Sequence, residues 1–316
     1  MKNLVAYQTG LRKIELREEE IAPPGPDEIQ VQCLANGICA GDIFLFGHNG
    51  GGKDYSPQRI GHEGVGVVVA KGMNVSSAKE GDYVQCFHWA KYSNIPLSKL
   101  VVFRQKPDVP VESLIEPPSC AVSAYHEYHV EPGDRALVVG AGYMGLLNVQ
   151  LLANSPLSEL VVCDLKKRNL ALATEFGATE TIELGSGDGD QKLEEYKKKP
   201  FDLVIECAGS DPALQTASEL VKLGGCLAIF SWHHTPRALD IGRWHLLGLR
   251  VANASPMIAA RRNFPAYERT ARLLESGIFK QQKLITHRFN IEDVQKAMEQ
   301  TLTRDDGFIK GAFLFS

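Results

Sequence analysis

The chain has 316 residues, with 34 lysines and arginines against 38 aspartates and glutamates, which gives a formal charge of −4 at pH 7. At roughly 100–200 residues per domain, this length predicts two domains. Hydrophobic residues make up 44% and charged residues 23%, a balance typical of globular proteins that excludes disordered and fibrous classes. Because acids outnumber bases and no lysine/arginine run exceeds three residues, we expect no nucleic-acid partner.

The cysteines and the apolar stretches indicate where the protein works. Seven cysteines, an odd number without closely spaced pairs, argue against a disulfide framework, so we expect a reducing, cytoplasmic location. The N-terminus shows no apolar signal core. Nothing charged lies between Arg135 and Glu159, but glycine, asparagine and glutamine interrupt that stretch, so we expect no membrane contact.

The first 120 or so residues are expected to be rich in β-strands. The predicted strands are residues 29–33, 65–69 and 83–87. Phe44 and Phe46 alternate with their neighbours as a buried strand would. No helix longer than about two turns is expected before Ser119.

From Arg135 onward, predicted strands alternate with predicted helices, which indicates right-handed βαβ units and a parallel sheet. The strands are expected at 136–139, 160–163, 201–206 and 226–230, and the helices at 143–153, 168–176 and 213–223. Gly185–Asp190 is expected to be a solvated loop, and residues 308–315 a further β segment.

Residues 140–145 fit the pattern G-x-G-x-x-G directly after one predicted strand and at the start of a helix. The first glycine allows a tight turn, the second lets the backbone approach a pyrophosphate, and the third lets helix and strand pack closely. The helix N-terminus adds amide donors for the anion. The alternative is a glycine-rich packing turn that binds nothing.

Asp164 ends the next predicted strand, where a carboxylate can bind both ribose hydroxyls. It would repel a 2′-phosphate, which favours NAD(H) over NADP(H). Lys166, Lys167 and Arg168 follow closely; they would weaken that preference or simply begin a solvated helix. The predicted cofactor contacts are Gly140, Gly142, Tyr143, Met144, Gly145, Asp164, Cys207 and Ser231, of which the last two follow strands near the expected nicotinamide.

Cys39, His62, Glu63 and Glu116 carry the ligand types of a catalytic zinc ion that keeps one coordination position open. Spacing alone leaves open whether they converge. Cys39 would also suit a small core position, and Glu116 a helix N-terminus. Glycines on both sides of His62-Glu63 indicate a side chain held at a tight bend.

Taken in order, these features resemble the zinc-dependent medium-chain dehydrogenase/reductase family, most closely its polyol branch of sorbitol and threonine dehydrogenases. The matching stretches are residues 37–42, 61–66, 81–84, 115–117, 140–145, 164, 206–209, 224–225 and 309–311. The resemblance implies an α/β protein with a GroES-like β-rich catalytic domain at 1–122 and 285–316. It also implies a Rossmann domain with a doubly wound parallel sheet at 123–284, and an active site in the cleft between the domains.

The resemblance further implies that Cys39 and His62 ligate one catalytic zinc, with Glu63 and Glu116 each either a direct ligand or held through water. Family members with a structural zinc carry a lobe of four closely spaced cysteines after the glycine-histidine-glutamate motif. Between Glu63 and Glu116 this chain contains only Cys86, so no structural zinc is expected.

Gly41 stands where the family usually has a serine or threonine whose hydroxyl passes the substrate proton outward. The proton route therefore stays open among water, the cofactor ribose, and the side chains of Asp42, His48 and Glu116.

The expected function is hydride transfer between NAD(H) and a secondary alcohol or ketone of a polyol, sugar or cyclitol. Candidate pocket residues for this hydroxylated substrate are Phe44, Phe46, His48, Trp89, His233 and His234. One alternative is a zinc-free NAD(P)H quinone or enone reductase of the same superfamily, and another is a non-catalytic NAD-binding sensor or structural protein. An exposed strand near Leu249–Ala254 predicts a homodimer or homotetramer by edge pairing.

Overall fold

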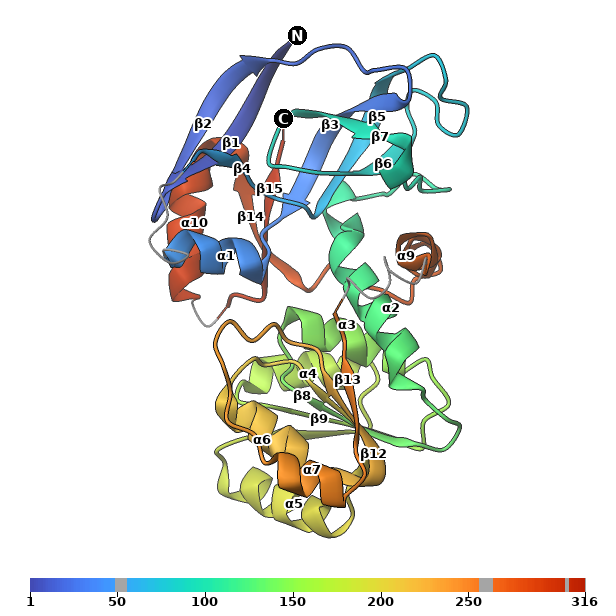
Figure 1. Cartoon of the computed structure of the whole chain (residues 1–316), viewed down its shortest axis with the longest axis vertical. Coiled ribbons are helices and arrows are strands. Elements are labelled where there is room, and N and C mark those ends of the chain that lie inside the picture. The colour runs from blue at the N-terminus through green and yellow to red at the C-terminus, as the bar shows by residue number, and fades with distance from the viewer. Residues whose placement is uncertain (49–55, 256–263, 305–306, 316) are drawn as a thin grey trace. The chain divides into compact units, whose positions relative to one another are not determined.

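The computed structural model describes residues 1–48, 56–255, 264–304 and 307–315. The chain forms two compact units, Met1–Pro117 with Thr270–Ser316 and Pro118–Arg269, so the first unit is built from both ends of the chain (Figure 1). Within the described residues, no helix is long and apolar enough to cross a membrane.

The described strands of the first unit form two β-sheets. Its strands are β1 (Lys2–Gly10), β2 (Lys13–Glu20), β3 (Glu28–Gly37), β4 (Gln58–Arg59), β5 (Gly64–Lys71), β6 (Tyr83–Cys86), β7 (Tyr92–Pro96), β14 (Ile285–Asn290) and β15 (Lys310–Leu314). The small sheet has the order β2-β1-β4, and the larger one the order β14-β15-β3-β5-β6, with β7 also paired to β3. Only the β14–β15 pair is parallel among these described strands. This β-rich unit confirms the expected GroES-like architecture.

Helices α1 (Ala40–Gly47) and α10 (Val294–Thr303) add apolar side chains to the core of the first unit. Short 3-10 turns occupy Leu97–Lys99, Pro110–Ser113 and Ile291–Asp293. Two further helices, α2 (Glu116–Tyr128) and α9 (Ala266–Glu275), each begin in one unit and end in the other.

The prediction of a strand around Phe44 and Phe46 is wrong, because both residues lie in helix α1. Asp42, Ile43 and Phe46 are its buried residues, a spacing that fits one helix face. Alternation over so few residues does not distinguish a strand from the face of a short helix. Phe46 is fully buried in the core and is therefore not a pocket residue.

Trp89 is also a core residue and not a pocket residue. Its indole is fully buried and donates a hydrogen bond to the carbonyl of Gly37 at 3.1 Å. Gly61 lies against the ring, and a Cβ at this position would be 2.3 Å from Trp89 Cδ1. The glycine before His62 thus leaves room for an indole, and its φ of +92° adds a second reason for glycine there.

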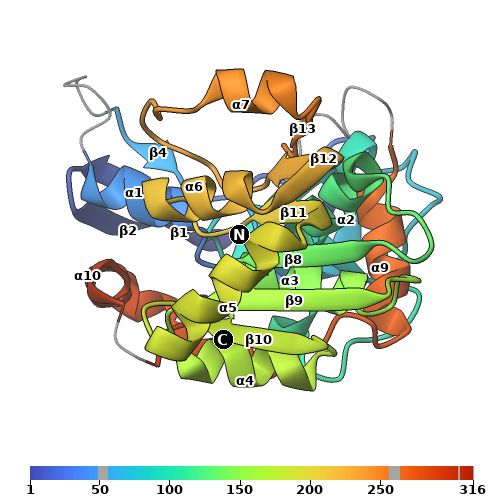
Figure 2. The ribbon, with the colours of Figure 1, turned by 90° about the horizontal axis from the view of Figure 1, so that it is seen from below.

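The second unit contains a parallel sheet with the order β10-β9-β8-β11-β12-β13. The strands are β8 (Arg135–Val139), β9 (Glu159–Asp164), β10 (Glu180–Glu183), β11 (Phe201–Glu206), β12 (Val221–Ile229) and β13 (Arg250–Asn253). The helices are α3 (Tyr143–Leu152), α4 (Lys167–Glu175), α5 (Gly187–Lys198), α6 (Asp211–Glu219) and α7 (Ile241–Leu246). In Figure 2, α5 and α6 cross in front of the strands while α3 lies behind them, as in a doubly wound Rossmann fold. The predicted α/β class is confirmed.

The expected solvated loop at Gly185–Asp190 is only partly present, because α5 begins at Gly187. Ser186 caps this helix by accepting a hydrogen bond from the Gly189 amide at 3.0 Å. Acidic residues in the first turn, Asp188 and Asp190, suit the positive end of the helix dipole. A glycine- and aspartate-rich segment is therefore compatible with a helix start as well as with a loop.

Among the described strands, β13 is the last in the order of this sheet, which places residues 250–253 of the segment expected as an edge at the end of the sheet. Pairing of that edge with a second copy stays a prediction.

Substitutions at two glycines of the first unit can distinguish the cost of backbone strain from the cost of a packing clash. Gly61 and Gly81 have nearly equal φ values of +92° and +89°, but of the two only Gly61 has neighbouring atoms within 4 Å of the place a Cβ would take. Gly81→Ala should lower the free energy of unfolding by about 1–2 kcal/mol through left-handed strain alone. Gly61→Ala should cost about 1–3 kcal/mol more because its methyl group meets Trp89. Urea unfolding measures both, and equal costs would contradict the packing role.

Candidate metal and dinucleotide sites

Two segments that are far apart in the sequence meet where β3 ends and β5 begins. The strands are antiparallel, with Asn36 opposite Gly64, and the Gly37 amide donates to the carbonyl of Glu63 at 3.1 Å. The buried Asn36 side chain accepts a hydrogen bond from the Glu63 amide at 3.1 Å. Cys39 follows β3 and His62 precedes β5, so this pairing brings the two potential ligands together.

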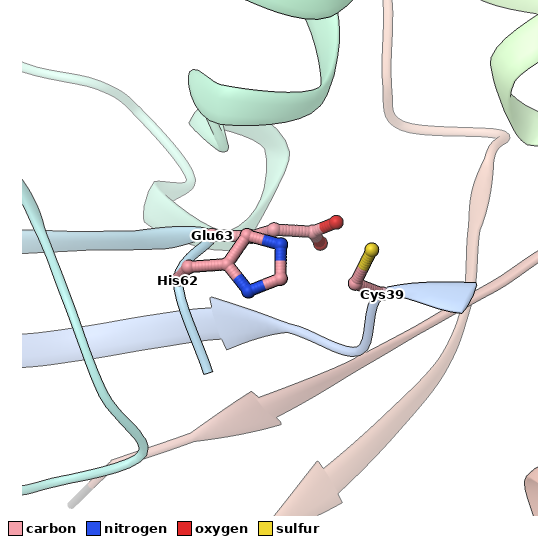
Figure 3. A group of neighbouring side chains, drawn as sticks. All are labelled: Cys39, His62 and Glu63. Atoms are coloured by element: carbon pink, nitrogen blue, oxygen red, sulfur yellow. The ribbon is translucent and has the colours of Figure 1, made fainter. Parts of the chain in front are cut away.

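Cys39, His62 and Glu63 each offer a ligand atom, and these atoms lie within 4.8 Å of one another (Figure 3). Ligand atoms around a tetrahedral zinc ion are roughly 3.3–3.8 Å apart, so a modest contraction of this group would complete a three-ligand set. Thiolate, imidazole and carboxylate are also the donor types that zinc accepts. The donor set therefore fits a zinc ion, and the structure brings these three residues together.

Glu63 is almost fully buried and forms an ion pair with Lys310 of β15, with Oε2 and Nζ 2.5 Å apart. Gly37 leaves room for the carboxylate, since a Cβ there would be 2.0 Å from Glu63 Oε2. Burial lowers the pKa of Lys310, but the charges of Glu63 and Cys39 and a hydrogen bond to Glu63 raise it by more. Lys310 therefore stays positively charged and compensates negative charge at the site.

Cys39 is the N-cap residue of α1, and its thiol accepts a hydrogen bond from the Gly41 amide at 3.4 Å. Burial raises the pKa of this thiol, and the Glu63 carboxylate raises it further, while Lys310 opposes the shift. Without a metal the thiol therefore stays protonated at neutral pH. A zinc ion would displace that proton, so its affinity should depend on pH.

Asp42 completes the capping of α1, because its carboxylate accepts a hydrogen bond from the Cys39 amide at 3.0 Å. Its other oxygen lies 3.8 Å from His62 Nδ1, which is beyond hydrogen-bond distance but close enough for attraction. Burial raises the pKa of Asp42 to about 6, while the neighbouring His62 opposes the rise. Asp42 therefore fixes the backbone of Cys39 through a hydrogen bond and places a carboxylate near the imidazole of His62.

Glu116 is not a member of the three-residue group found among the described residues. It is the first residue of α2, and its charge contributes to raising the pKa values of Cys39 and Lys310. Of the two carboxylates expected as ligands, the geometry thus favours Glu63 in this structure.

The glycine-rich turn of the second unit has the spacing that a dinucleotide needs. A Cβ at Gly145 would be 1.9 Å from the carbonyl of Gly140, so the third glycine is required for helix and strand to pack. Gly142 differs, because a Cβ there would have no atom within 4 Å. The second glycine thus borders open space at the start of α3, where amide groups can receive a pyrophosphate. These residues fit the cofactor.

Asp164 lies at the end of β9, next to this turn. Its carboxylate accepts hydrogen bonds from the Ala141 amide at 2.6 Å and the Lys166 amide at 2.8 Å. Tyr143 is buried and Met144 half-buried at the start of α3, so Tyr143 offers a ligand mainly its backbone. Asp164 is therefore oriented by the turn that would hold the pyrophosphate.

Cys207 and Ser231 follow the ends of β11 and β12, as expected. The Ser231 hydroxyl donates to the fully buried carboxylate of Glu206, the last residue of β11. His233 also contacts this carboxylate, with Nε2 3.0 Å from Oε2. Of the remaining candidates, His48 stacks on Phe44 with ring centroids 4.6 Å apart, and His234 packs against Trp232 at 4.4 Å.

Sequence reasoning missed two buried charges that organise these sites, Lys310 and Glu206. Each had a signal that was available. Lys310 is the charged residue in the apolar segment 308–315, and Glu206 ends an apolar strand. A charge at such a position needs a buried partner, but the partner's identity depends on the tertiary fold.

The chain is similar to known proteins in both sequence and fold. Residues 25–98 match the alcohol dehydrogenase GroES-like domain, and residues 144–271 match the zinc-binding dehydrogenase domain. The chain is 26% identical to a sorbitol dehydrogenase of Bacillus subtilis, over 96% of this chain and 94% of that protein. It is 27% identical to a D-xylulose reductase of Saccharomyces cerevisiae, over 87% of each chain.

The fold is similar to that of a solved oxidoreductase/dehydrogenase of unknown specificity from Escherichia coli. The TM-score is 0.89 over the full length of both chains, at 24% sequence identity. The two domain matches, the full-length relatives and the shared fold lead to one assignment. This chain is a dehydrogenase of the zinc-type medium-chain dehydrogenase/reductase family.

Proposed function

We propose that this protein transfers a hydride between NAD(H) and the secondary alcohol or ketone of a polyol, sugar or cyclitol, with one zinc ion held by Cys39, His62 and Glu63. The observation that carries the proposal is the convergence of these three ligand atoms within 4.8 Å. A zinc ion in this position supplies Lewis-acid chemistry, which makes a substrate hydroxyl more acidic.

The protein's own residues prepare this site in three ways. Cys39 and His62 provide a soft and a borderline donor that select zinc over hard cations. The ammonium group of Lys310 compensates the negative charge of the Glu63 carboxylate, which would otherwise be buried without a partner of opposite charge. Asp42 holds the helix cap and thereby the direction of the Cys39 thiol.

The second unit supplies the cofactor contacts. Gly142 gives the pyrophosphate access to the backbone, and Asp164 offers acceptors to the ribose hydroxyls. A carboxylate at this position opposes the 2′-phosphate of NADP, which supports NAD as the preferred cofactor. The bound nicotinamide supplies the hydride acceptor, and the protein sets its position.

The two relatives named for sorbitol and xylulose support a substrate with several hydroxyl groups. Trp89, a candidate pocket residue, does not contribute to substrate binding, since its ring is buried.

A panel of hydroxyl compounds tests this assignment. The purified protein, loaded with zinc, should reduce NAD in the presence of sorbitol, xylitol or myo-inositol, and should use NADP less well. Initial rates of NADH formation measure this. Turnover of ethanol but of none of the polyols would overturn the substrate class, and NADPH-dependent quinone reduction without zinc would favour the reductase alternative.

Cys39→Ser tests the metal ligand. Serine keeps a side-chain acceptor for capping α1 but is a poor zinc ligand, so the variant should lose most bound zinc and turnover while NADH binding stays. Zinc content by elemental analysis and NADH titration measure the two effects. The matched control Cys226→Ala, in the second unit, should retain zinc. Full zinc content in Cys39→Ser would contradict the assigned site.

Gly142→Ala and Gly145→Ala separate cofactor access from folding. Gly142→Ala should leave the melting temperature nearly unchanged, because its Cβ meets no atom, but should weaken NADH binding by about tenfold or more. Gly145→Ala should lower stability by about 1–3 kcal/mol or more, because its Cβ collides with the Gly140 carbonyl. Thermal unfolding and NADH fluorescence measure both. Wild-type NADH affinity in Gly142→Ala would contradict the placement of the pyrophosphate.

A further inference from the structure

A buried hydrogen-bond network lies at the ends of β11 and β12, and its centre is Glu206. This carboxylate is fully buried, and its Oε1 accepts hydrogen bonds from the amides of Ala208 and Gly209, both at 2.7 Å. Its Oε2 accepts from the Ser231 hydroxyl and lies 3.0 Å from His233 Nε2. One carboxylate thus fixes the segments that follow two neighbouring strands.

The partner of the other imidazole nitrogen determines where the His233 proton is. Arg237 Nε donates to His233 Nδ1 at 2.9 Å, and since a guanidinium has no acceptor, Nδ1 must accept. The proton of the neutral ring is therefore on Nε2, from which it is donated to Glu206. Ser231 and Glu206 both contact Nε2 and not opposite nitrogens, so this group is not arranged as a hydrolytic triad.

Arg237 extends the network from one loop to the other. One of its terminal nitrogens donates to the carbonyl of Gly209 at 3.0 Å, and the other lies 3.3 Å from the Asp211 carboxylate. The loop after β12 is therefore tied to the turn after β11 through a guanidinium, an imidazole and a carboxylate. None of these three groups has a role in the hydride transfer proposed above.

The place of the network in the sheet indicates what it serves. β11 pairs with β8, whose end carries the glycine turn, and β12 pairs with β11 on the far side. A dinucleotide bound at the glycine turn extends along the carboxyl ends of such strands. With strands about 4.8 Å apart, the end of β12 is about 10 Å from that of β8, on the side of the glycine turn that faces away from β9 and Asp164.

We propose that Arg237, His233 and Glu206 are positioning residues that hold the backbone at Cys207–Gly209 and Ser231 in place for the nicotinamide half of the dinucleotide. This inference deepens the proposed function and rests on it. It assigns the adenosine half to Asp164 and the glycine turn, and the nicotinamide half to the network. Loss of the network should therefore affect ligands that contain nicotinamide and spare those that lack it.

Two variants and two ligands test the inference. His233→Phe keeps a ring without nitrogens, and Arg237→Met keeps an unbranched side chain without donors. The dissociation constant for NADH should rise roughly tenfold in each variant, the loss expected from one or two buried hydrogen bonds. The constant for ADP-ribose, which lacks the nicotinamide, should stay within about twofold of the wild-type value. Calorimetric titration measures both constants.

Arg243→Lys is the matched control, because Arg243 also donates to a backbone carbonyl, that of Glu219, outside the network. It should bind both ligands as the wild type does. Equal weakening of NADH and ADP-ribose in His233→Phe and Arg237→Met would overturn the inference in favour of a general structural role. Unchanged NADH binding in both variants would also overturn it. Failure of the wild-type protein to bind NADH would overturn the proposed function and this inference together. The variant outcomes above would overturn the inference alone, so the two conclusions can be told apart.

Discussion

The antiparallel pairing of β3 with β5 is the interaction on which the metal site depends. It places the residues that follow β3 beside those that precede β5, and this brings Cys39 close to His62 and Glu63. A shift of one residue in register would turn the side chains of a strand to its opposite face. The buried side chain of Asn36 bonds to the Glu63 amide, and this contact ties the ligand segment to β3.

The C-terminal strand completes the same site from the other side of β3. β15 pairs with β3, with Ala312 opposite Gly37, and this register brings Lys310 to Glu63. A buried ion pair contributes little net stability, because desolvation offsets the attraction. Its effect here is on charge, since the ammonium group offsets one carboxylate in a set that also contains a thiol. Segments from both ends of the chain are thus needed for one candidate ion.

The second unit uses a different principle, in which successive strands of a parallel sheet present their carboxyl ends along one edge. Asp164, the glycine turn, Cys207 and Ser231 follow β9, β8, β11 and β12 in spatial order. The backbone provides most of the proposed ligand contacts, and buried side chains hold that backbone in place. Asp164 does so for the glycine turn and Glu206 for the turn after β11. Carboxylates therefore orient loops at both ends of the candidate dinucleotide site.

The sequence by itself determined the parallel α/β unit and the glycine turn, because strand, turn, helix and acid follow one another within a single βαβ unit and each signal is local. It also named Cys39, His62 and Glu63 as ligand types. Only the tertiary structure decided that these three converge and that Phe46 and Trp89 belong to the core. The same holds for the partners of Lys310 and Glu206. Those outcomes depend on strand register and on packing between residues distant in the chain, which periodicity and spacing along the sequence do not encode.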